Sequence, residues 1–185
     1  MRQLNDRPVE LCDKGRAGKV ACRAAAARCG PIAEAADIYK HILIPTDGSE
    51  LSMKAVTHGL SLAKAVGATA TIIMATRMWS AMDMSEHARH GEKHPVEEYE
   101  ERFARVATKV LAGCKTKADE AGVPVETQHI KDMDPDEAIV RTAADKGCDL
   151  ILMASHARGP IGRMLLGSVA LKVLTHTKIP VQIVR

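Results

Sequence analysis

Aromatic residues are scarce in this chain of 185 residues, which contains one Trp, one Phe and two Tyr. Proteins that bind single-stranded nucleic acid stack the bases on aromatic side chains, so this scarcity argues against that class of function. The formal net charge is only +3, and no predicted helix concentrates it. General electrostatic binding to DNA or to an anionic membrane surface is therefore not indicated.

Long apolar runs and paired cysteines are also missing. No run approaches the roughly 18 consecutive apolar residues that a membrane-spanning helix needs. The five cysteines are odd in number and include no Cys-x-x-Cys pair, so neither a disulfide framework nor a zinc knuckle is indicated. The sequence predicts a protein of the reducing cytoplasm, with neither a membrane nor a nucleic acid as its partner.

The first 37 residues differ from the rest because they are rich in Arg and Ala and show no sustained hydrophobic periodicity. We interpret residues 1–37 as an N-terminal extension, disordered or loosely helical, and residues 38–185 as the single folded domain. A tail, a vector-derived leader or an over-long start each fits better than a transit peptide, because the segment lacks Ser and carries acids. Its GRAGKV stretch departs from the P-loop pattern at two positions, so we assign it no phosphate.

Regular alternation of strand and helix patterns begins at Tyr39. Apolar runs predict strands at 41–45, 68–76, 123–132, 148–154 and 179–184, and helical periodicity predicts helices at 51–67, 95–122, 134–147 and 167–177. In the first helix, a stripe of Leu51, Ala55, Leu62 and Val66 is expected to face the core. Asp134 is expected to cap the third helix, with Pro135 at its first position. Each parallel return needs a helical crossover, so the fold class is doubly wound α/β with helices on both faces.

Ligands of such sheets lie beyond the carboxyl ends of the strands, where the strand order reverses. The loops there are 46–50, 77–94 and 155–166, and the last exceeds the usual length of roughly two to six residues. By itself, the segment Thr46-Asp47-Gly48-Ser49 indicates a turn and a helix N-cap, in which Asp or Ser accepts a backbone N–H. Gly167-Ser168, at the start of the last helix, offers N–H groups suited to an anion.

Three stretches carry a family resemblance: YKHILIPTDGSELSMKAV, DPDEAIVRTAADKGCDLILMASHARG and GRMLLGSVALKVLTHTKIPVQIVR. Together they resemble the universal stress protein family from about Tyr39 to Arg185. The resemblance implies a flavodoxin-like domain, a parallel five-stranded sheet in the order 3-2-1-4-5 and, commonly, a homodimer. Some members of that family bind ATP and others do not.

Nucleotide-binding members of that family carry Gly-x-x-Gly, nine residues, and then Gly-Ser or Gly-Thr. Here Ala154 and Ala157 replace the two glycines, whereas Gly167-Ser168 matches. An alanine forced into a left-handed conformation costs on the order of 1 kcal/mol, and its methyl group takes space that a phosphate oxygen needs. Arg158 and Arg163 supply compensating positive charge. Phosphate binding is therefore expected to be weakened but not excluded.

The resemblance also implies which residues form the site, with Asp47 facing the adenine and the 155–169 segment holding phosphates. The predicted nucleotide-binding residues are Pro45, Thr46, Asp47, Ala75, Met153, Ala154, His156, Ala157, Arg158, Gly167, Ser168 and Val169. The expected ligand is ATP or another adenine nucleotide, with no metal beyond the Mg²⁺ that accompanies it. No catalytic residue is assigned.

Two further groups of residues could carry chemistry. His87, His90 and His94 would share one face of a helix, as a zinc or nickel site requires, but Gly91 and Pro95 indicate a loop whose histidines are solvated. Cys148 is interpreted as a small buried hydrophobe rather than a nucleophile, because no base lies beside it in the sequence.

Three functional hypotheses follow. The first is an adenine-nucleotide-binding protein of the stress response, with regulation rather than catalysis as its work. The second is a nucleotide-free interaction protein that acts by binding a protein partner, joined as a homodimer through the edge strand at 179–184. The third, an ATP hydrolase or nucleotidyl-transfer enzyme, lacks the Ser-Gly-Gly-x-Asp-Ser loop of the related PP-loop enzymes, so we expect no dedicated enzymatic activity.

Overall fold

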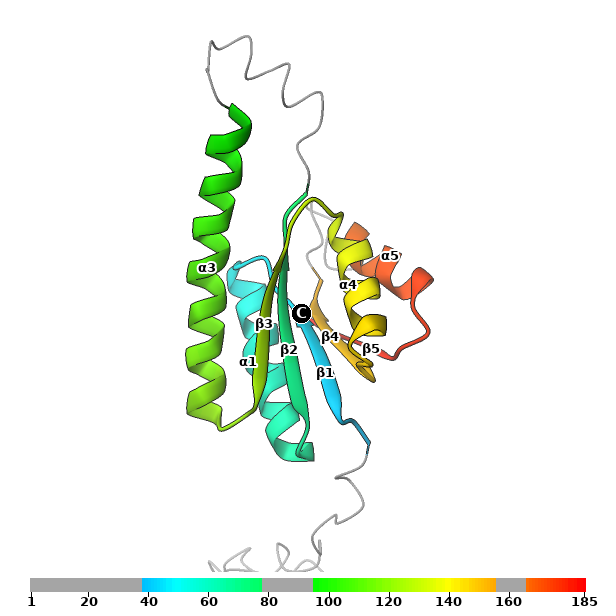
Figure 1. The fold of residues 1–185 in the computed structure, drawn as a ribbon. Coiled ribbons are helices and arrows are strands. Elements are labelled where there is room, and N and C mark those ends of the chain that lie inside the picture. Colours follow the sequence, from blue (N-terminus) through cyan, green and yellow to red (C-terminus); the bar gives the residue numbers. More distant parts are fainter. Residues whose placement is uncertain (1–37, 78–94, 156–165) are drawn as a thin grey trace, which may run out of the picture. The chain divides into compact units, whose positions relative to one another are not determined.

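A computed structural model of the protein describes residues 38–77, 95–155 and 166–185. The strands are β1 (His41–Pro45), β2 (Thr69–Ala75), β3 (Val125–Ile130), β4 (Leu150–Ala154) and β5 (Val181–Val184). The helices are α1 (Glu50–Val66), α3 (Pro95–Ala121), α4 (Pro135–Asp145) and α5 (Ser168–His176). Figure 1 shows their alternation along the chain.

The five strands form one parallel sheet in the order β3-β2-β1-β4-β5. This confirms the predicted fold class and strand order. The central strand β1 pairs with β2 so that Pro45 lies opposite Ile73, and with β4 so that Leu43 lies opposite Ile151. The strands β2 and β3 therefore lie on one side of β1 and β4 and β5 on the other, which is the defining property of a doubly wound sheet.

Two hydrophobic cores lie on the two faces of the sheet (Figure 1). Ile42 and Ile44 of β1 pack against α1 and α3, whereas Leu43 packs against α4 and α5. All three side chains are fully buried. A parallel strand covered on both faces has no polar side, and this explains why β1 and β4 are continuous apolar runs rather than alternating ones.

The buried stripe of α1 differs from the predicted one. Its buried residues are Ser52, Ala55, Val56, Gly59, Leu60 and Ala63, whereas Leu51, Leu62 and Val66 are only partly buried. A Cβ atom on Gly59 would lie 2.6 Å from Ile44 Cδ1 and 3.4 Å from Leu152 Cδ2. The helix thus approaches the sheet so closely that small residues occupy the centre of its buried face and larger ones flank it.

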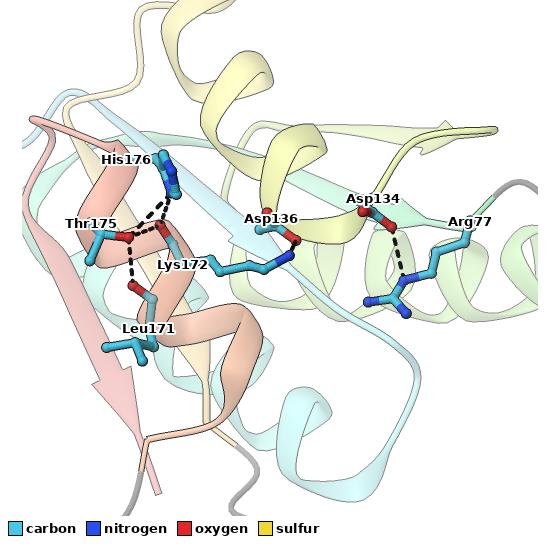
Figure 2. Close-up of polar contacts among 7 residues, drawn as sticks. All are labelled: Arg77, Asp134, Asp136, Leu171, Lys172, Thr175 and His176. Atoms are coloured by element: carbon cyan, nitrogen blue, oxygen red, sulfur yellow. Dashed lines mark hydrogen bonds and ion pairs between the residues drawn. The ribbon is translucent and has the colours of Figure 1, made fainter.

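Asp134 occupies the N-cap position of α4 with extended backbone, and Pro135 begins the helix, as predicted. The prediction that the Asp134 side chain caps the helix is wrong, because the carboxylate makes no cap hydrogen bond. Its Oδ1 instead lies 3.1 Å from Nε of Arg77, which follows β2 (Figure 2). The guanidinium offers a charged partner, and the ion pair joins the end of β2 to the start of α4.

No helix within 38–77, 95–155 and 166–185 combines the length and apolar character that crossing a membrane requires.

Candidate functional site

The strand order reverses at β1. The chain passes from β1 to β2 on one side and, after β3, crosses to β4 on the other side of β1. The carboxyl ends of β1 and β4 therefore flank the switch point, where open α/β sheets bind ligands. The β1–α1 turn and the segment that follows β4 both begin at this edge.

Thr46 anchors the β1–α1 turn. Its side chain is buried, its N–H donates to the Ile73 carbonyl at 2.8 Å, and its hydroxyl accepts the Gly48 N–H at 3.2 Å. Ser49 is the N-cap of α1 and accepts the Ser52 N–H at 3.2 Å, while Asp47 Oδ1 accepts the Ser49 N–H at 3.0 Å. The turn-and-cap geometry expected from the sequence is thus present. It holds the Asp47 side chain exposed at the end of β1.

Gly48 fixes the shape of this turn because its φ of +78° lies in the left-handed region that favours glycine. A Cβ atom here would approach Cγ2 of Val110 on α3 to 2.8 Å. The turn is therefore packed against α3 as well as α1. A change in the spacing of α1 and α3 would therefore move the Thr46–Ser49 backbone.

Ser155 joins the end of β4 to the start of α5. The residue is 8% exposed, its N–H donates to the Val184 carbonyl at 3.2 Å, and its Oγ accepts the Gly167 N–H at 2.9 Å. Gly167 is the N-cap of α5 and its N–H is already used by Ser155, so the N–H groups offered to a ligand begin at Ser168. Ser155 begins the segment 155–169 that was predicted to hold phosphates, but it was not named among the site residues; a polar residue directly after a buried strand is the signal that marks it.

Ala154 lies at the end of β4 without backbone strain. Among the described non-glycine residues, only Asp132 has a positive φ, of 56°. The expectation that an alanine here adopts a costly left-handed conformation is therefore wrong for Ala154, because the residue is part of an extended strand. Its methyl group packs against the core beneath α1 and α3. Any effect of Ala154 on a bound ligand is therefore steric and not conformational. Ala157 lies outside the described residues.

The other predicted site residues occupy the same edge of the sheet in different ways. Pro45 and Ala75 end β1 and β2 and are partly buried. Met153 is 5% exposed and, with Val169, packs in the core beneath α4 and α5, whereas Ser168 is exposed in the first turn of α5. His156, Arg158 and the histidines at 87, 90 and 94 lie outside the described residues. Within the described ranges, no group of three or more His, Cys, Asp or Glu is arranged to hold a metal ion.

Burial shifts the pKa of two groups in this sheet, Cys148 just before β4 and His129 in β3. Cys148 is buried as predicted; that burial, reinforced by the negative charge of Asp149, raises its pKa to about 11. His129 Nε2 lies 2.9 Å from the Thr76 hydroxyl, at the ends of β3 and β2. Desolvation, helped by the positive charge of Lys131, lowers the pKa of His129. The imidazole is therefore neutral at neutral pH, and the Cys148 sulfur remains a thiol.

Residues 38–185 match the universal stress protein family. Universal stress protein MJ0531 of Methanocaldococcus jannaschii is 32% identical over 149 residues, which span 80% of this chain and 84% of that protein.

Solved structures agree in fold. The protein MJ0577, also from Methanocaldococcus jannaschii, superposes with a TM-score of 0.64 at 25% identity, over 80% of this chain and 96% of that one. A universal stress protein in complex with cAMP has a TM-score of 0.58 at 24% identity, over 80% and 98%. One from Archaeoglobus fulgidus in complex with dAMP has a TM-score of 0.55 at 17% identity, over 80% and 99%. The family match spans every strand and helix described above, and the chain belongs to the universal stress protein family.

Proposed function

We propose that this protein binds adenine nucleotides at the carboxyl ends of β1 and β4, as a regulatory protein of the stress response rather than as an enzyme. One observation carries the proposal. The hydrogen bond from Gly167 N–H to Ser155 Oγ, 2.9 Å long, fastens the start of α5 to the end of β4. This contact holds the N-terminus of α5 at the switch point of the sheet, where the exposed Asp47 turn also lies.

The start of α5 suits a phosphate group. The first N–H groups of a helix have no intrahelical acceptor, and the helix dipole adds a partial positive charge there. Ser168 contributes an exposed hydroxyl at the first helical position, and Gly167 places no side chain over the helix end. These features bind an anion without any metal ligand from the protein.

The Asp47 carboxylate suits adenine. Its oxygens accept hydrogen bonds, and adenine presents an exocyclic amine where guanine presents a carbonyl oxygen. The carboxylate therefore favours ATP over GTP. The two neighbours solved with cAMP and dAMP hold ligands that share an adenine and a single phosphate, and this supports the adenine class over other nucleotides.

Binding rather than catalysis is proposed because the hydroxyl that would meet the phosphates in the described part of the site, that of Ser168, has no chemical activation. Within the described ranges, no hydrogen bond joins the Ser168 hydroxyl to a histidine or carboxylate that could serve as its base. An unactivated hydroxyl is a poor nucleophile. Slow hydrolysis of bound ATP is compatible with this site, but it would not define an enzyme.

A calorimetric titration tests the proposal. The full chain should bind ATP more tightly than GTP, and the double substitution Ala154→Gly with Ala157→Gly should tighten ATP binding by about tenfold, because glycine at both positions allows the backbone to approach the phosphates more closely. Each protein is also titrated with GTP as the matched control. Absence of heat with ATP for both proteins would refute the proposed function. Equal ATP affinity for the two would show that the alanines do not hinder the ligand.

The geometry of β5 favours a second property, self-association into a homodimer. In the described part of the chain, β5 is the edge strand and pairs only with β4. Ile151 donates its N–H to the Pro180 carbonyl and Ser155 donates its N–H to the Val184 carbonyl. The N–H and C=O groups of Val181 and Ile183 therefore point away from β4, toward the open side of the strand. An edge strand whose side chains are mostly apolar invites a second strand, and a two-fold pair would join it to its own copy.

The substitution Val181→Pro is expected to convert the homodimer into a monomer, seen as a halved mass in light scattering. Proline removes an N–H that faces outward, so pairing between β4 and β5 should survive. The matched control is Gln182→Pro, which removes an N–H on the β4 side and should lower thermal stability as well. A wild-type protein that is monomeric at micromolar concentration, or a Val181→Pro variant that stays dimeric, would rule out this interface.

A further inference from the structure

Met53, in the second turn of α1, connects the β1–α1 turn to α3 through its sulfur atom. The Thr46 hydroxyl points at Sδ from 3.8 Å, and the Cys114 thiol on α3 from 3.9 Å. The side chain is partly buried and also lines an open groove between α1 and α3, together with Glu50, Lys54, Thr57, His58, Ser61 and Lys117. The Met53 side chain thus contacts the core on one side and lines an open groove on the other.

Access to solvent separates Met53 from most other sulfur atoms in the described ranges. Met74 and Met153 are 4% and 5% exposed, so a small oxidant reaches them slowly. Burial raises the pKa of the Cys114 thiol, and that of Cys148 is about 11. Both stay protonated at neutral pH and react poorly, because peroxides attack thiolates. A thioether needs no deprotonation before it reacts with a peroxide. Met53 and Met133 are the partly exposed methionines within the described ranges, so these two are the side chains open to oxidation.

We propose that Met53 is an oxidation site through which a peroxide loosens the β1–α1 turn and weakens nucleotide binding. The second half of this proposal rests on the proposed function. The reaction is a two-electron oxygen transfer in which the thioether and hydrogen peroxide give methionine sulfoxide and water. The sulfur lone pair attacks one peroxide oxygen, the O–O bond breaks, and the departing hydroxide takes up the remaining proton.

The hydrogen bonds around Thr46 explain why an oxygen atom added to Met53 Sδ would alter the β1–α1 turn. The Thr46 and Ser52 hydroxyls lie 2.9 Å apart, so either can donate to the other. The Thr46 hydroxyl can instead donate to the Met53 sulfur, and the Ser52 hydroxyl to the Ser49 carbonyl. A sulfoxide oxygen is a much stronger acceptor than a thioether sulfur. It would draw the Thr46 proton away from Ser52 and displace the hydroxyl that accepts the Gly48 N–H.

Packing acts in the same direction. Sδ lies against the Cys114 thiol, whose residue is fully buried, so the added oxygen has little room on the α3 side. The added volume would push α1 and α3 apart. Because Gly48 is packed against Val110 of α3, the turn that carries Asp47 would follow the movement.

The experiment compares the full-length wild type with Met53→Leu, which keeps the side-chain volume but cannot be oxidised, and with Met133→Leu as the matched control. Each protein is treated with hydrogen peroxide. Peptide mass mapping then locates added oxygen, amide hydrogen exchange reports on residues 46–52, and calorimetry gives the ATP affinity. All other methionines remain in Met53→Leu, so any difference from the wild type belongs to Met53. Melting curves before treatment verify that both variants fold.

In the wild type and in Met133→Leu, oxidation of Met53 should speed exchange in the turn and weaken ATP binding, each on the order of tenfold. In Met53→Leu, neither should change. The proposal is overturned if Met53 stays unmodified at a dose that oxidises Met133, or if peroxide speeds exchange equally in Met53→Leu. Should the untreated protein bind no ATP, the proposed function fails, and mass mapping with exchange still decides whether Met53 is the oxidation site.

Discussion

Replacing Gly59 by leucine is expected to lower the free energy of unfolding by about 3 kcal/mol, the upper part of the range for overpacked cores. Even a Cβ atom at this position would lie 2.6 Å from Ile44 Cδ1 and 3.1 Å from Ile44 Cγ1. Ile44 is fully buried in the central strand, so it has no room to withdraw. Leucine would lift α1 away from β1 and β4.

The control is the same substitution at Gly113, which lies exposed in α3, where a Cβ atom would meet nothing within 4 Å. Both changes remove a helical glycine, so both gain up to about 1 kcal/mol of helix propensity. At Gly113 that gain should appear as increased stability, whereas at Gly59 the steric cost should exceed it. Urea denaturation followed by circular dichroism measures both. Equal stability of the two variants would refute the close approach of α1 to the sheet.

The second large effect is expected at Asp47, where Asp47→Asn should weaken ATP binding by about tenfold or more, as expected for loss of a hydrogen bond to a charged acceptor. Asparagine keeps an oxygen that can accept the Ser49 N–H, the contact that Asp47 Oδ1 makes in the turn. It replaces the other carboxylate oxygen by an NH₂ group, which donates and therefore opposes the amine of adenine.

Two comparisons separate base recognition from damage to the turn. Asp47→Ala removes the turn contact as well, so it should lower the melting temperature in addition to the affinity, whereas Asp47→Asn should leave the melting temperature nearly unchanged. Affinity for GTP should fall far less than affinity for ATP in Asp47→Asn, because guanine presents no amine at that position. An unchanged ATP affinity in Asp47→Asn would mean that the carboxylate does not read the base.

The order of elements could be predicted from the sequence because parallel strands and amphipathic helices leave strong patterns, whereas the strand order followed from the family resemblance. Runs such as HILIP and LILMA have no polar side, and each is bounded by turn residues. The turn at Thr46–Ser49 was predictable for a similar reason. The hydrogen bonds that the Thr46, Asp47 and Ser49 side chains accept from backbone N–H groups span at most three residues, so residue type and spacing determine them.

Features that depend on contacts between distant segments were not predictable. Asp134 looked like a helix cap, but its carboxylate pairs with Arg77, 57 positions earlier in the chain. The buried stripe of α1 was misplaced because helical spacing alone does not fix which face meets the sheet, and the close approach at Gly59 buries a neighbouring stripe instead. Ser155 was not singled out because its importance lies in a hydrogen bond to Gly167, 12 positions later in the chain.

Native mass spectrometry of the full-length protein tests most directly whether the switch point of this sheet holds an adenine nucleotide. The spectrum is recorded for the protein as purified and again after addition of equal concentrations of ATP and GTP. We predict a mass increment of one adenine nucleotide per chain, present in the wild type, enhanced in Ala154→Gly with Ala157→Gly and reduced in Asp47→Asn. A spectrum of unliganded protein at every nucleotide concentration, or equal occupancy by ATP and GTP that Asp47→Asn leaves unchanged, would contradict adenine-nucleotide binding at this site.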